Sequence, residues 1–281
     1  MKLSPFTPLN FAESNASDGL HSRYTQVFSP TDQIMIQVVA DAEETAPTGT
    51  LYDACTDEVV DTITWNEWEI NEDTVIYFHV FCGLSDGFYK LTIEDKTSEV
   101  FRVTSDEGIL AKTTLLQYSN KDNKQRDDVL FVIDNVHYFF DFRVPGGFKD
   151  NGWDFGVENE QFTTQYQDVV ELYAYDYVTK TFTMGNSIGV PVWFGAMLNR
   201  LLTCQFVYVN AVRYVRESGN TPSMETLIDG LDSFIFTQTL RKTVRIDADY
   251  EDDNQIAIRR VDDDYDRIID NEDTNIRTLE I

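Results

Sequence analysis

Residues 137–148 read HYFFDFRVPGGF, and this stretch carries the clearest strand pattern in the chain. Apolar side chains recur at every second position from Tyr138 to Val144, which is the period of a β-strand. The Pro-Gly-Gly that follows permits a tight turn with positive φ. We therefore expect a strand that ends before Pro145, within a largely antiparallel β architecture.

Similar short runs occupy residues 31–104, and turn formers such as Ser85-Asp86-Gly87 bound each of them. The runs are QIMIQVVAD, TGTLYDAC, VVDTITWNEWEI, TVIYFHVFCG, GFYKLTIED and SEVFRVTS. Several short strands at regular spacing are typical of an antiparallel sandwich. We expect an immunoglobulin-like β-sandwich over residues 31–104.

Residues 105–246 combine strand patterns with one helix. Pro191 stands near the first turn of VPVWFGAMLNRLLTC, whose apolar residues recur at helical spacing. The stretch FTTQYQDVVELYAYDYVTKTFTMGN predicts two long strands joined by a turn near Val178-Thr179-Lys180. These features predict an α+β domain with antiparallel strands and one main helix.

The two ends of the chain lack this periodicity. Residues 1–30 are rich in Ser, Asn and Pro and predict an extended N-terminal arm. Residues 247–281 form an acidic C-terminal arm, either a solvated tail or a segment that orders on a partner. The expected fold is mainly β or α+β, with a sandwich, an α+β domain and two terminal arms.

The chain has 49 acidic and 22 basic residues, for a net charge of −27. Such an excess makes nucleic acid and anionic membranes poor partners. No apolar run reaches the roughly 18 residues of a membrane span, and the first residues lack the apolar core of a secretory signal. The charge suits a protein that stays soluble until it meets a specific partner.

Motifs for catalysis or cofactors are missing from the sequence. The three His have no ligand-spaced partners, and we find no nucleophile elbow and no phosphate-binding glycine loop. We expect no cofactor and no dedicated metal site, with incidental Ca²⁺ binding at the acidic clusters of the C-terminus. Glu158 and Glu160, with Trp153, are the nearest match to a sugar-cleaving carboxylate pair.

A polar knot, KDNKQRDD at residues 121–128, separates two apolar runs. One interpretation is a solvated loop. The other is a docking loop in which Lys121, Lys124 and Arg126 contact an acidic neighbour, such as a second copy of this acidic chain.

The succession LLQYSNKDN, FDFRVPGGF and GVPVWFGAMLNRLLTCQFVYVNAVRYVR, after an arm and a small sandwich, resembles virion structural proteins of tailed phages that infect Bacteroidetes. The resemblance is to proteins of the tail, collar or baseplate, including the crAss-like group, and it covers residues 25–246 as an order of motifs. It implies a non-enzymatic subunit that repeats around a ring, made in the host bacterial cytoplasm and located in the virion. The implied partners are copies of itself and other tail or neck proteins.

We expect interaction residues in three places: the polar knot, the glycine turn and the C-terminal arm. They are Lys121, Lys124, Arg126, Gly146, Gly147, Phe148, Ile256, Ile258, Arg259 and Arg260. Two alternative functions remain. One is a carbohydrate- or host-surface-binding sandwich that uses exposed Trp and Tyr, and the other is a polysaccharide hydrolase with paired carboxylates.

Overall fold

The computed structural model describes residues 1–13, 24–185, 188–227, 232–243, 267–269 and 276–278. The fold is mainly β, with 55% strand and 6% helix, several antiparallel sheets and one main helix. The expected mainly β architecture with a single principal helix is therefore confirmed.

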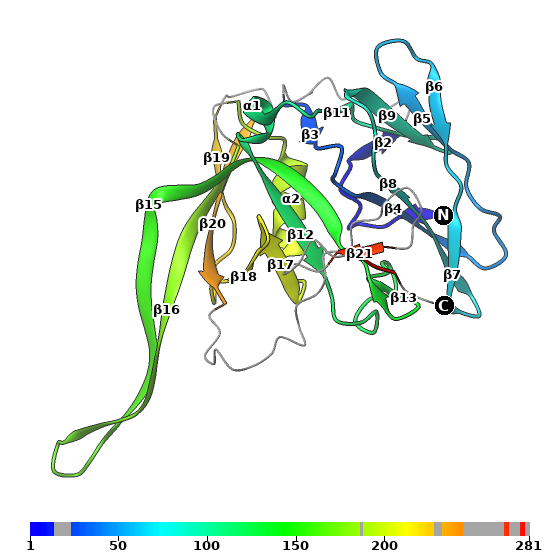
Figure 1. The fold of residues 1–281 in the computed structure, drawn as a ribbon. Coiled ribbons are helices and arrows are strands. Elements are labelled where there is room, and N and C mark those ends of the chain that lie inside the picture. The colour runs from blue at the N-terminus through cyan, green and yellow to red at the C-terminus, as the bar shows by residue number, and fades with distance from the viewer. Residues whose placement is uncertain (14–23, 186–187, 228–231, 244–266, 270–275, 279–281) are drawn as a thin grey trace.

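Two sheets are built largely from the first 104 residues and lie together in the body (Figure 1). The first sheet has the order β1 (Lys2–Leu3), β4 (Ile34–Asp41), β8 (Thr74–Phe81) and β7 (Asn66–Asn71). The second sheet has the order β2 (Phe11–Glu13), β10 (Lys96–Ser98), β9 (Gly87–Ile93), β11 (Phe101–Val103) and β3 (Gln26–Phe28). Strand β9 also pairs with β5 (Gly49–Asp53), and β5 pairs in turn with β6 (Val59–Thr62).

A hydrophobic core fills the space between these two sheets. Ile34, Ile36 and Val38 project from one face of β4, and Leu51 and Leu91 meet them from the second sheet. All five side chains are almost fully buried. The alternation along β4 thus supplies one layer of a two-layer packing.

The N-terminal stretch differs from the expected arm. Its described part supplies β1, β2 and β3 to the two sheets, and Phe6 and Phe28 are fully buried. The Tyr118 hydroxyl donates to the carbonyl of Phe6 at 2.5 Å. The segment is rich in Ser, Asn and Pro, but a few well-placed apolar side chains are enough to anchor it.

A third sheet is formed by the second half of the chain. Its order is β16 (Val169–Met184), β15 (Phe140–Thr163), β12 (Thr113–Ser119), β17 (Phe206–Val209), β18 (Val212–Arg216), β20 (Phe234–Lys242) and β19 (Ser223–Thr226). Because β16 also pairs with β20, all of its strands except β19 form a closed circuit. Two small pairs complete the strands: β13 (Val132–Ile133) with β14 (Val136–His137), and β21 (Arg267–Ile269) with β22 (Ile276–Thr278).

The main helix, α2 (Val192–Leu201), begins after Pro191 as predicted and packs on this third sheet. The Phe194 and Phe142 rings lie 5.0 Å apart between centroids. Gly195 allows the close approach to β20, because a Cβ at that position would overlap the Phe236 ring. A short helix, α1 (Glu107–Leu110), was not expected, and Asp106 caps it by accepting from two backbone N–H groups.

The first sheet also contributes to the core of the second half. Met35, Ile76 and Phe78, from the other faces of β4 and β8, join the cluster around Leu116 and Phe142. The Gln37 side chain, fully buried, accepts from Leu130 N–H and donates to Leu130 C=O, both at 2.8 Å. The first sheet therefore packs with one face against the second sheet and with its other face against the core of the second half of the chain.

The turn expected at Pro145-Gly146-Gly147 is wrong, because β15 continues through it to Thr163. Gly146 pairs with Met184 inside the sheet and has a φ of 115°. A Cβ there would overlap the carbonyl oxygen of Thr183. The positive φ was predicted correctly, but it serves a close strand contact rather than a chain reversal.

The turn expected at Val178-Thr179-Lys180 is also wrong. These residues lie inside β16, and the chain reverses at residues 164–168, where Thr164 N–H donates to the carbonyl of Asp168 at 2.8 Å. The result is a single long hairpin of β15 and β16 that projects from the body (Figure 1).

Candidate interaction surface

The distal part of this hairpin, residues 155–178, is called the arm, and the rest of the described residues is called the body. The last pair between β16 and β20 is Thr179 with Arg241, and the pairing of β12 with β15 ends at Pro145. Beyond these points β15 and β16 pair only with each other. The arm is therefore a two-stranded ribbon whose outer edges have no neighbouring strand among the described residues.

Large apolar side chains on the arm are exposed to solvent. Phe155 is 78% exposed and Tyr166, at the tip, is 81% exposed. The others with large exposed fractions are Val157, Phe162, Val169, Val170, Leu172, Tyr173 and Tyr175. Contiguous exposed apolar surface of this kind marks sites of interaction.

The strand register sorts these side chains into two faces. On one face, Phe155 lies opposite Val178 and Val157 lies opposite Asp176. On the other face, Glu158 lies opposite Tyr175, and Glu160 lies opposite Tyr173. Both faces therefore carry apolar or aromatic groups and carboxylates, since Glu171 accepts from Asn159 on the face of Val157 and Asp176.

The root of the arm is braced against the closed sheet. The Arg241 guanidinium lies 3.9 Å from the Tyr177 ring centroid and 3.1 Å from the Glu158 carboxylate. Tyr177 lies over Gly156, where a Cβ would overlap the ring. On the opposite face, Lys180 Nζ lies 3.7 Å from the Trp153 ring centroid. These contacts fix the direction in which the arm leaves the body.

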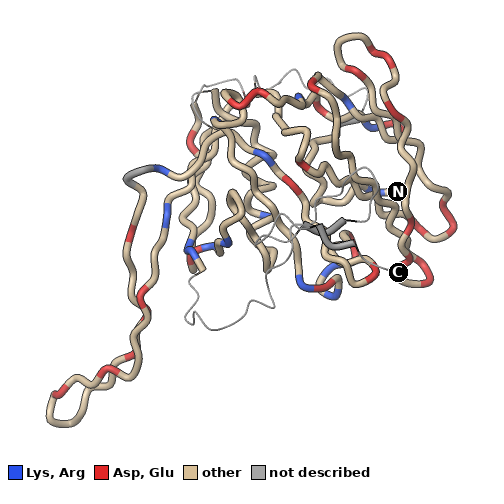
Figure 2. Tube along the Cα trace, viewed as in Figure 1, with Lys and Arg blue, Asp and Glu red and all other residues tan. Residues whose placement is uncertain are grey.

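The arm is acidic throughout. Residues 155–178 contain Glu158, Glu160, Asp168, Glu171 and Asp176, and no Lys or Arg. Figure 2 shows these acidic positions along the ribbon and basic positions only at its root. A partner that covers the arm must offer both apolar surface and positive charge.

Several concave surfaces among the described residues carry basic side chains, and the two considered as partners for an arm are a groove and a hollow. A groove of about 870 Å³ lies under the arm, where Tyr175 and Tyr177 face Arg216 and Lys242. Its lining also includes acidic residues, Glu158 and Asp176.

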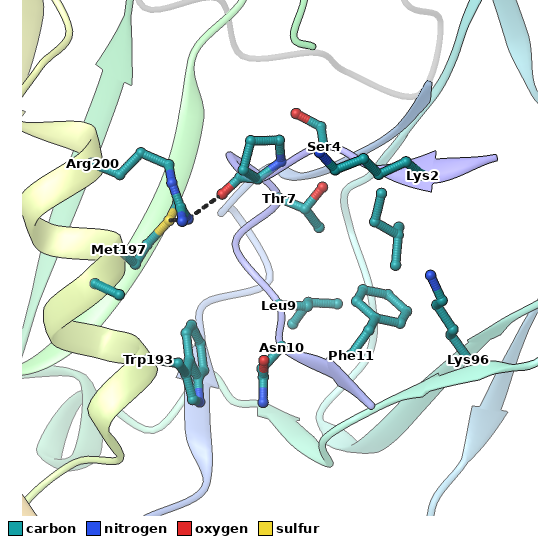
Figure 3. Close-up of a pocket in the computed structure, with 13 residues that line it drawn as sticks. Lys2, Ser4, Thr7, Leu9, Asn10, Phe11, Lys96, Trp193, Met197 and Arg200 are labelled. Atoms are coloured by element: carbon teal, nitrogen blue, oxygen red, sulfur yellow. Dashed lines mark hydrogen bonds between the residues drawn. The ribbon is translucent and has the colours of Figure 1, made fainter. Parts of the chain in front are cut away.

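The second concave surface is a hollow of about 370 Å³ between the N-terminal residues and α2, called the N-terminal pocket below. Figure 3 shows Trp193, Met197 and Arg200 on one side and Lys2, Phe11 and Lys96 on the other. Arg200 closes one end by donating to the carbonyl of Pro5 at 2.5 Å.

The polar knot is a folded loop rather than a free basic one. Arg126 forms two hydrogen bonds with Asp128, at 2.7 and 2.6 Å, and lies 4.8 Å from the Phe6 ring centroid. The ion pair lowers the pKa of Asp128. Asn123 accepts from the N–H groups of Phe131 and Val132 and closes the loop. Arg126 thus has its partners within its own chain.

Lys121 and Lys124 are exposed, as a docking role requires. However, the loop also contains Asp122, Asp127 and Asp128, so residues 121–128 carry three bases and three acids and have no net charge. The geometry therefore gives little reason for this loop to attract an acidic neighbour.

The predicted glycine site lies inside the sheet. The Phe148 ring lies 4.8 Å from that of Tyr214 and 5.5 Å from that of Phe182. Gly146 and Gly147 pair with Met184 and Thr183. These residues hold β15 against β16, and the structure does not bring them together with the polar knot as one surface.

The C-terminal predictions, Ile256, Ile258, Arg259 and Arg260, lie outside the described residues, as do the acidic clusters expected to bind Ca²⁺ incidentally. Within the described ranges, no group of three or more His, Cys, Asp or Glu is placed to hold a metal ion. Over the same part of the chain, no helix is long and apolar enough to cross a membrane.

The paired-carboxylate candidate does not assemble as expected. Glu158 and Glu160 share a face, but Trp153 is an odd number of residues away and lies on the opposite one. Glu158 is already paired with Arg241.

The arm was not predicted from the sequence. The available signal was the cluster TTQYQD at residues 163–168, whose polar residues are typical of a turn. The alternation on either side then marks two strands of similar length that face water on both sides.

Comparison with family models, with curated proteins and with solved structures finds no match for this chain.

Proposed function

We propose that this protein is a non-enzymatic structural subunit of a phage virion that forms a ring or collar in the tail, neck or baseplate. Its partners would be copies of itself in head-to-tail contact and other tail or neck proteins, after synthesis in the host bacterial cytoplasm. The observation that carries the proposal is the arm, a projecting ribbon with apolar side chains exposed on both faces.

An isolated two-stranded hairpin is at best marginally stable in water. Beyond Thr179 the arm pairs with no strand outside the hairpin, and its contacts with the body lie near its root, at Arg241 and along the groove. Burial of Phe155, Tyr166 or Leu172 against another molecule would stabilise it by roughly 1.5–3 kcal/mol for each side chain fully covered. An element of this kind is expected to function within an assembly.

The asymmetry of the subunit supports head-to-tail assembly. The arm leaves the body at one side, so an arm that contacts a different surface of the next copy makes a heterologous contact. Such contacts close into a ring when the rotation between copies divides the circle. Our proposal of a ring rests on this geometry together with the resemblance described above.

We also propose that the first two sheets form a sandwich of the immunoglobulin-like type. The antiparallel pairing of β4 with β8, and of β5 and β11 with β9, around one shared core supports this assignment. The parallel pairing of β3 with β11 adds an edge strand from the N-terminal stretch.

The proposal is tested by replacing residues 155–178 with an Asn-Gly turn that joins Asp154 to Thr179. We expect the wild-type chain to form defined multimers by light scattering and negative-stain imaging, and the armless chain to stay monomeric. Thermal unfolding should be little changed, because the deleted residues lie outside both hydrophobic cores. A wild-type chain that remains monomeric at all accessible concentrations would contradict self-assembly.

A binding module is the second candidate. The sandwich tryptophans do not favour it, because Trp65 donates to the carbonyl of Pro47 at 2.5 Å and Trp68 packs on the core. Tyr173 and Tyr175 do, since their exposed rings lie 5.6 Å apart on the arm and offer a stacking surface for sugars. A glycan array with wild-type and armless protein distinguishes this role, because only carbohydrate binding would give a signal that disappears with the arm.

A polysaccharide hydrolase, the third candidate, has no specific support from the described geometry. Glu158 and Glu160 stand on an exposed ribbon, away from Trp153.

A further inference from the structure

The N-terminal pocket is lined by basic side chains, as is a second hollow that Lys112 and Lys149 line beside Gly147. The lining of the N-terminal pocket contains Lys2, Lys96 and Arg200 and no acidic residue, although the chain as a whole has a net charge of −27. Glu99 lies at its border, where the carboxylate accepts from Asn10 at 3.0 Å and from Trp193 at 3.3 Å. Glu13 lies opposite Lys96 in the pairing of β2 with β10, and Asp128 lies near Lys2 and Arg200. The lining itself is therefore basic, with carboxylates just outside it.

The lining of the pocket is also partly apolar, and one of its buried polar groups has no hydrogen-bond partner. Leu9, Phe11 and Trp193 contribute apolar surface to it. The hydroxyl of Thr7, a residue that is 6% exposed, is buried without a hydrogen-bond partner. Burial lowers the pKa of Arg200, which reports a partly desolvated guanidinium with only neutral acceptors. An aromatic group with a hydroxyl, accompanied by a carboxylate, would match all three features.

The tip of the arm presents such a group. The turn at residues 164–168 is closed by two backbone hydrogen bonds, from Thr164 N–H to Asp168 C=O at 2.8 Å and from Gln167 N–H to Thr164 C=O at 2.9 Å. Tyr166 projects from this turn and is 81% exposed, more than any other large apolar side chain in the described residues. Asp168 stands two residues away. The tip therefore combines a phenol and a carboxylate on a hydrogen-bonded turn.

We infer that the arm of one copy inserts Tyr166 into the N-terminal pocket of the next copy, with Asp168 close to Lys2 and Lys96. This inference rests on the proposed ring assembly and names the two surfaces that make its contact. From Phe155 to Tyr166 the ribbon extends about 35 Å, at about 3.3 Å per residue, which is long enough to reach a neighbouring body. The basic side chains that line the pocket balance the acidic side chains of the arm. The Thr7 hydroxyl gains a hydrogen-bond partner in the Tyr166 hydroxyl.

The first test compares single variants of the full chain by light scattering over a range of concentrations. Tyr166→Ala and Lys96→Glu should each raise the concentration for half assembly at least about tenfold, which corresponds to about 1.4 kcal/mol. Lys242→Glu is the matched control, because it makes the same charge change in the groove under the arm. The inference requires Lys242→Glu to assemble like wild type.

A charge-exchange experiment provides a second test. Asp168→Lys should weaken assembly, and the double variant Asp168→Lys/Lys96→Glu should regain much of it. Far-UV circular dichroism and thermal unfolding check that each variant is folded. If Lys96→Glu unfolds the protein, Lys96→Gln replaces it with the same expectation at smaller magnitude.

A photo-crosslinking amino acid at position 166 gives an independent readout. Crosslinks between copies should map to residues 2–11, Lys96 or residues 193–200. Crosslinks to the groove under the arm, or loss of assembly in Lys242→Glu alone, would overturn the inference in favour of that groove. If the armless chain is monomeric while Tyr166→Ala and Lys96→Glu assemble normally, only this inference fails. If the armless chain assembles like wild type, the proposed function fails with it.

Discussion

Two antiparallel strand pairs in this protein have the same backbone geometry and opposite surroundings. The pair of β4 and β8 is buried on both faces, one against the second sheet and the other against the core of the third. The arm, made by β15 and β16, is exposed on both faces. Hydrogen bonds between strands are present in each, so the difference lies in what covers the side chains. The chain's own sheets cover the side chains of β4 and β8, whereas the large apolar side chains of the arm are left exposed.

The largest effect should come from comparing a phenylalanine in each region. Phe142 is fully buried and its ring lies 5.0 Å from Phe194 and 5.8 Å from Trp193. Phe142→Ala should lower the free energy of unfolding by about 3–5 kcal/mol, the range for a buried aromatic. Phe155→Ala should leave the free energy of unfolding of the monomer nearly unchanged. Urea unfolding measures both, and equal losses would contradict the division into body and arm.

The next effect is pH-dependent and concerns the seam between β15 and the first sheet. Asp32 pairs with Arg143 at 2.6 Å, and burial, followed by the charge of Asp32, raises the pKa of Asp141 to about 7. Between pH 4 and 7 the folded state keeps a proton on Asp141 that the unfolded chain loses. The free energy of unfolding should therefore fall as pH rises through this window, by up to about 1.4 kcal/mol per pH unit.

Asp141→Asn should remove that slope, because no proton is then exchanged at this position. The carboxylate accepts from Gln33 N–H at 2.8 Å and from the Gln117 amide at 2.9 Å, and the Gln117 amide can rotate to accept from an asparagine. Urea titrations of both proteins at pH 4.5, 6 and 7.5 measure the difference. Parallel curves for wild type and variant would show that Asp141 is ionised throughout.

A third comparison separates folding from docking in the polar knot. Arg126→Glu should destabilise the monomer, because the substitution removes the ion pair with Asp128 and the cation–π contact with the Phe6 ring. Lys124→Glu should affect neither stability nor assembly if docking occurs elsewhere. A strong loss of assembly in Lys121→Glu or Lys124→Glu, with unchanged thermal unfolding, would restore the docking-loop hypothesis.

The smallest expected effect is at the root of the arm. Arg241→Ala removes an exposed ion pair with Glu158 and the contact with Tyr177, each contributing up to about 1 kcal/mol. We expect little change in global unfolding and faster amide hydrogen exchange in residues 169–178. Unchanged exchange there would show that the arm is held by the strand pairing alone.

The sequence predicted the elements whose local pattern and packing agree. Pro191 and the helical spacing after it located α2, and the alternation of Phe140, Phe142 and Val144 located the buried part of β15. The continuous apolar run of β4 was also read as a strand. Its two-sided burial was not foreseen, although a strand without alternation is typical of burial on both faces.

The rest depended on contacts that a linear pattern does not contain. Gly146 lies opposite Met184 only because β15 passes its expected end, and that requires β16 to run beside it. The true turn at residues 164–168 competes with Val178-Thr179-Lys180, which has no stronger turn residues of its own. The carbonyl of Phe6 accepts a hydrogen bond from the hydroxyl of Tyr118, which lies 112 residues further along the chain. Such long-range partners decide between local alternatives of similar strength.

The continuity of β15 has a mechanical consequence. The same strand forms a wall of the body at Phe140 and reaches the arm at Phe155, with no loop between them. A load applied at the tip would run along the strand in shear, across many hydrogen bonds at once, into the seam at Asp32 and Arg143. The register of β15 with β16 breaks between Phe148 and Trp153, at the root, and again between Glu160 and Gln161, within the arm, so the ribbon should bend at these two points before it tears away.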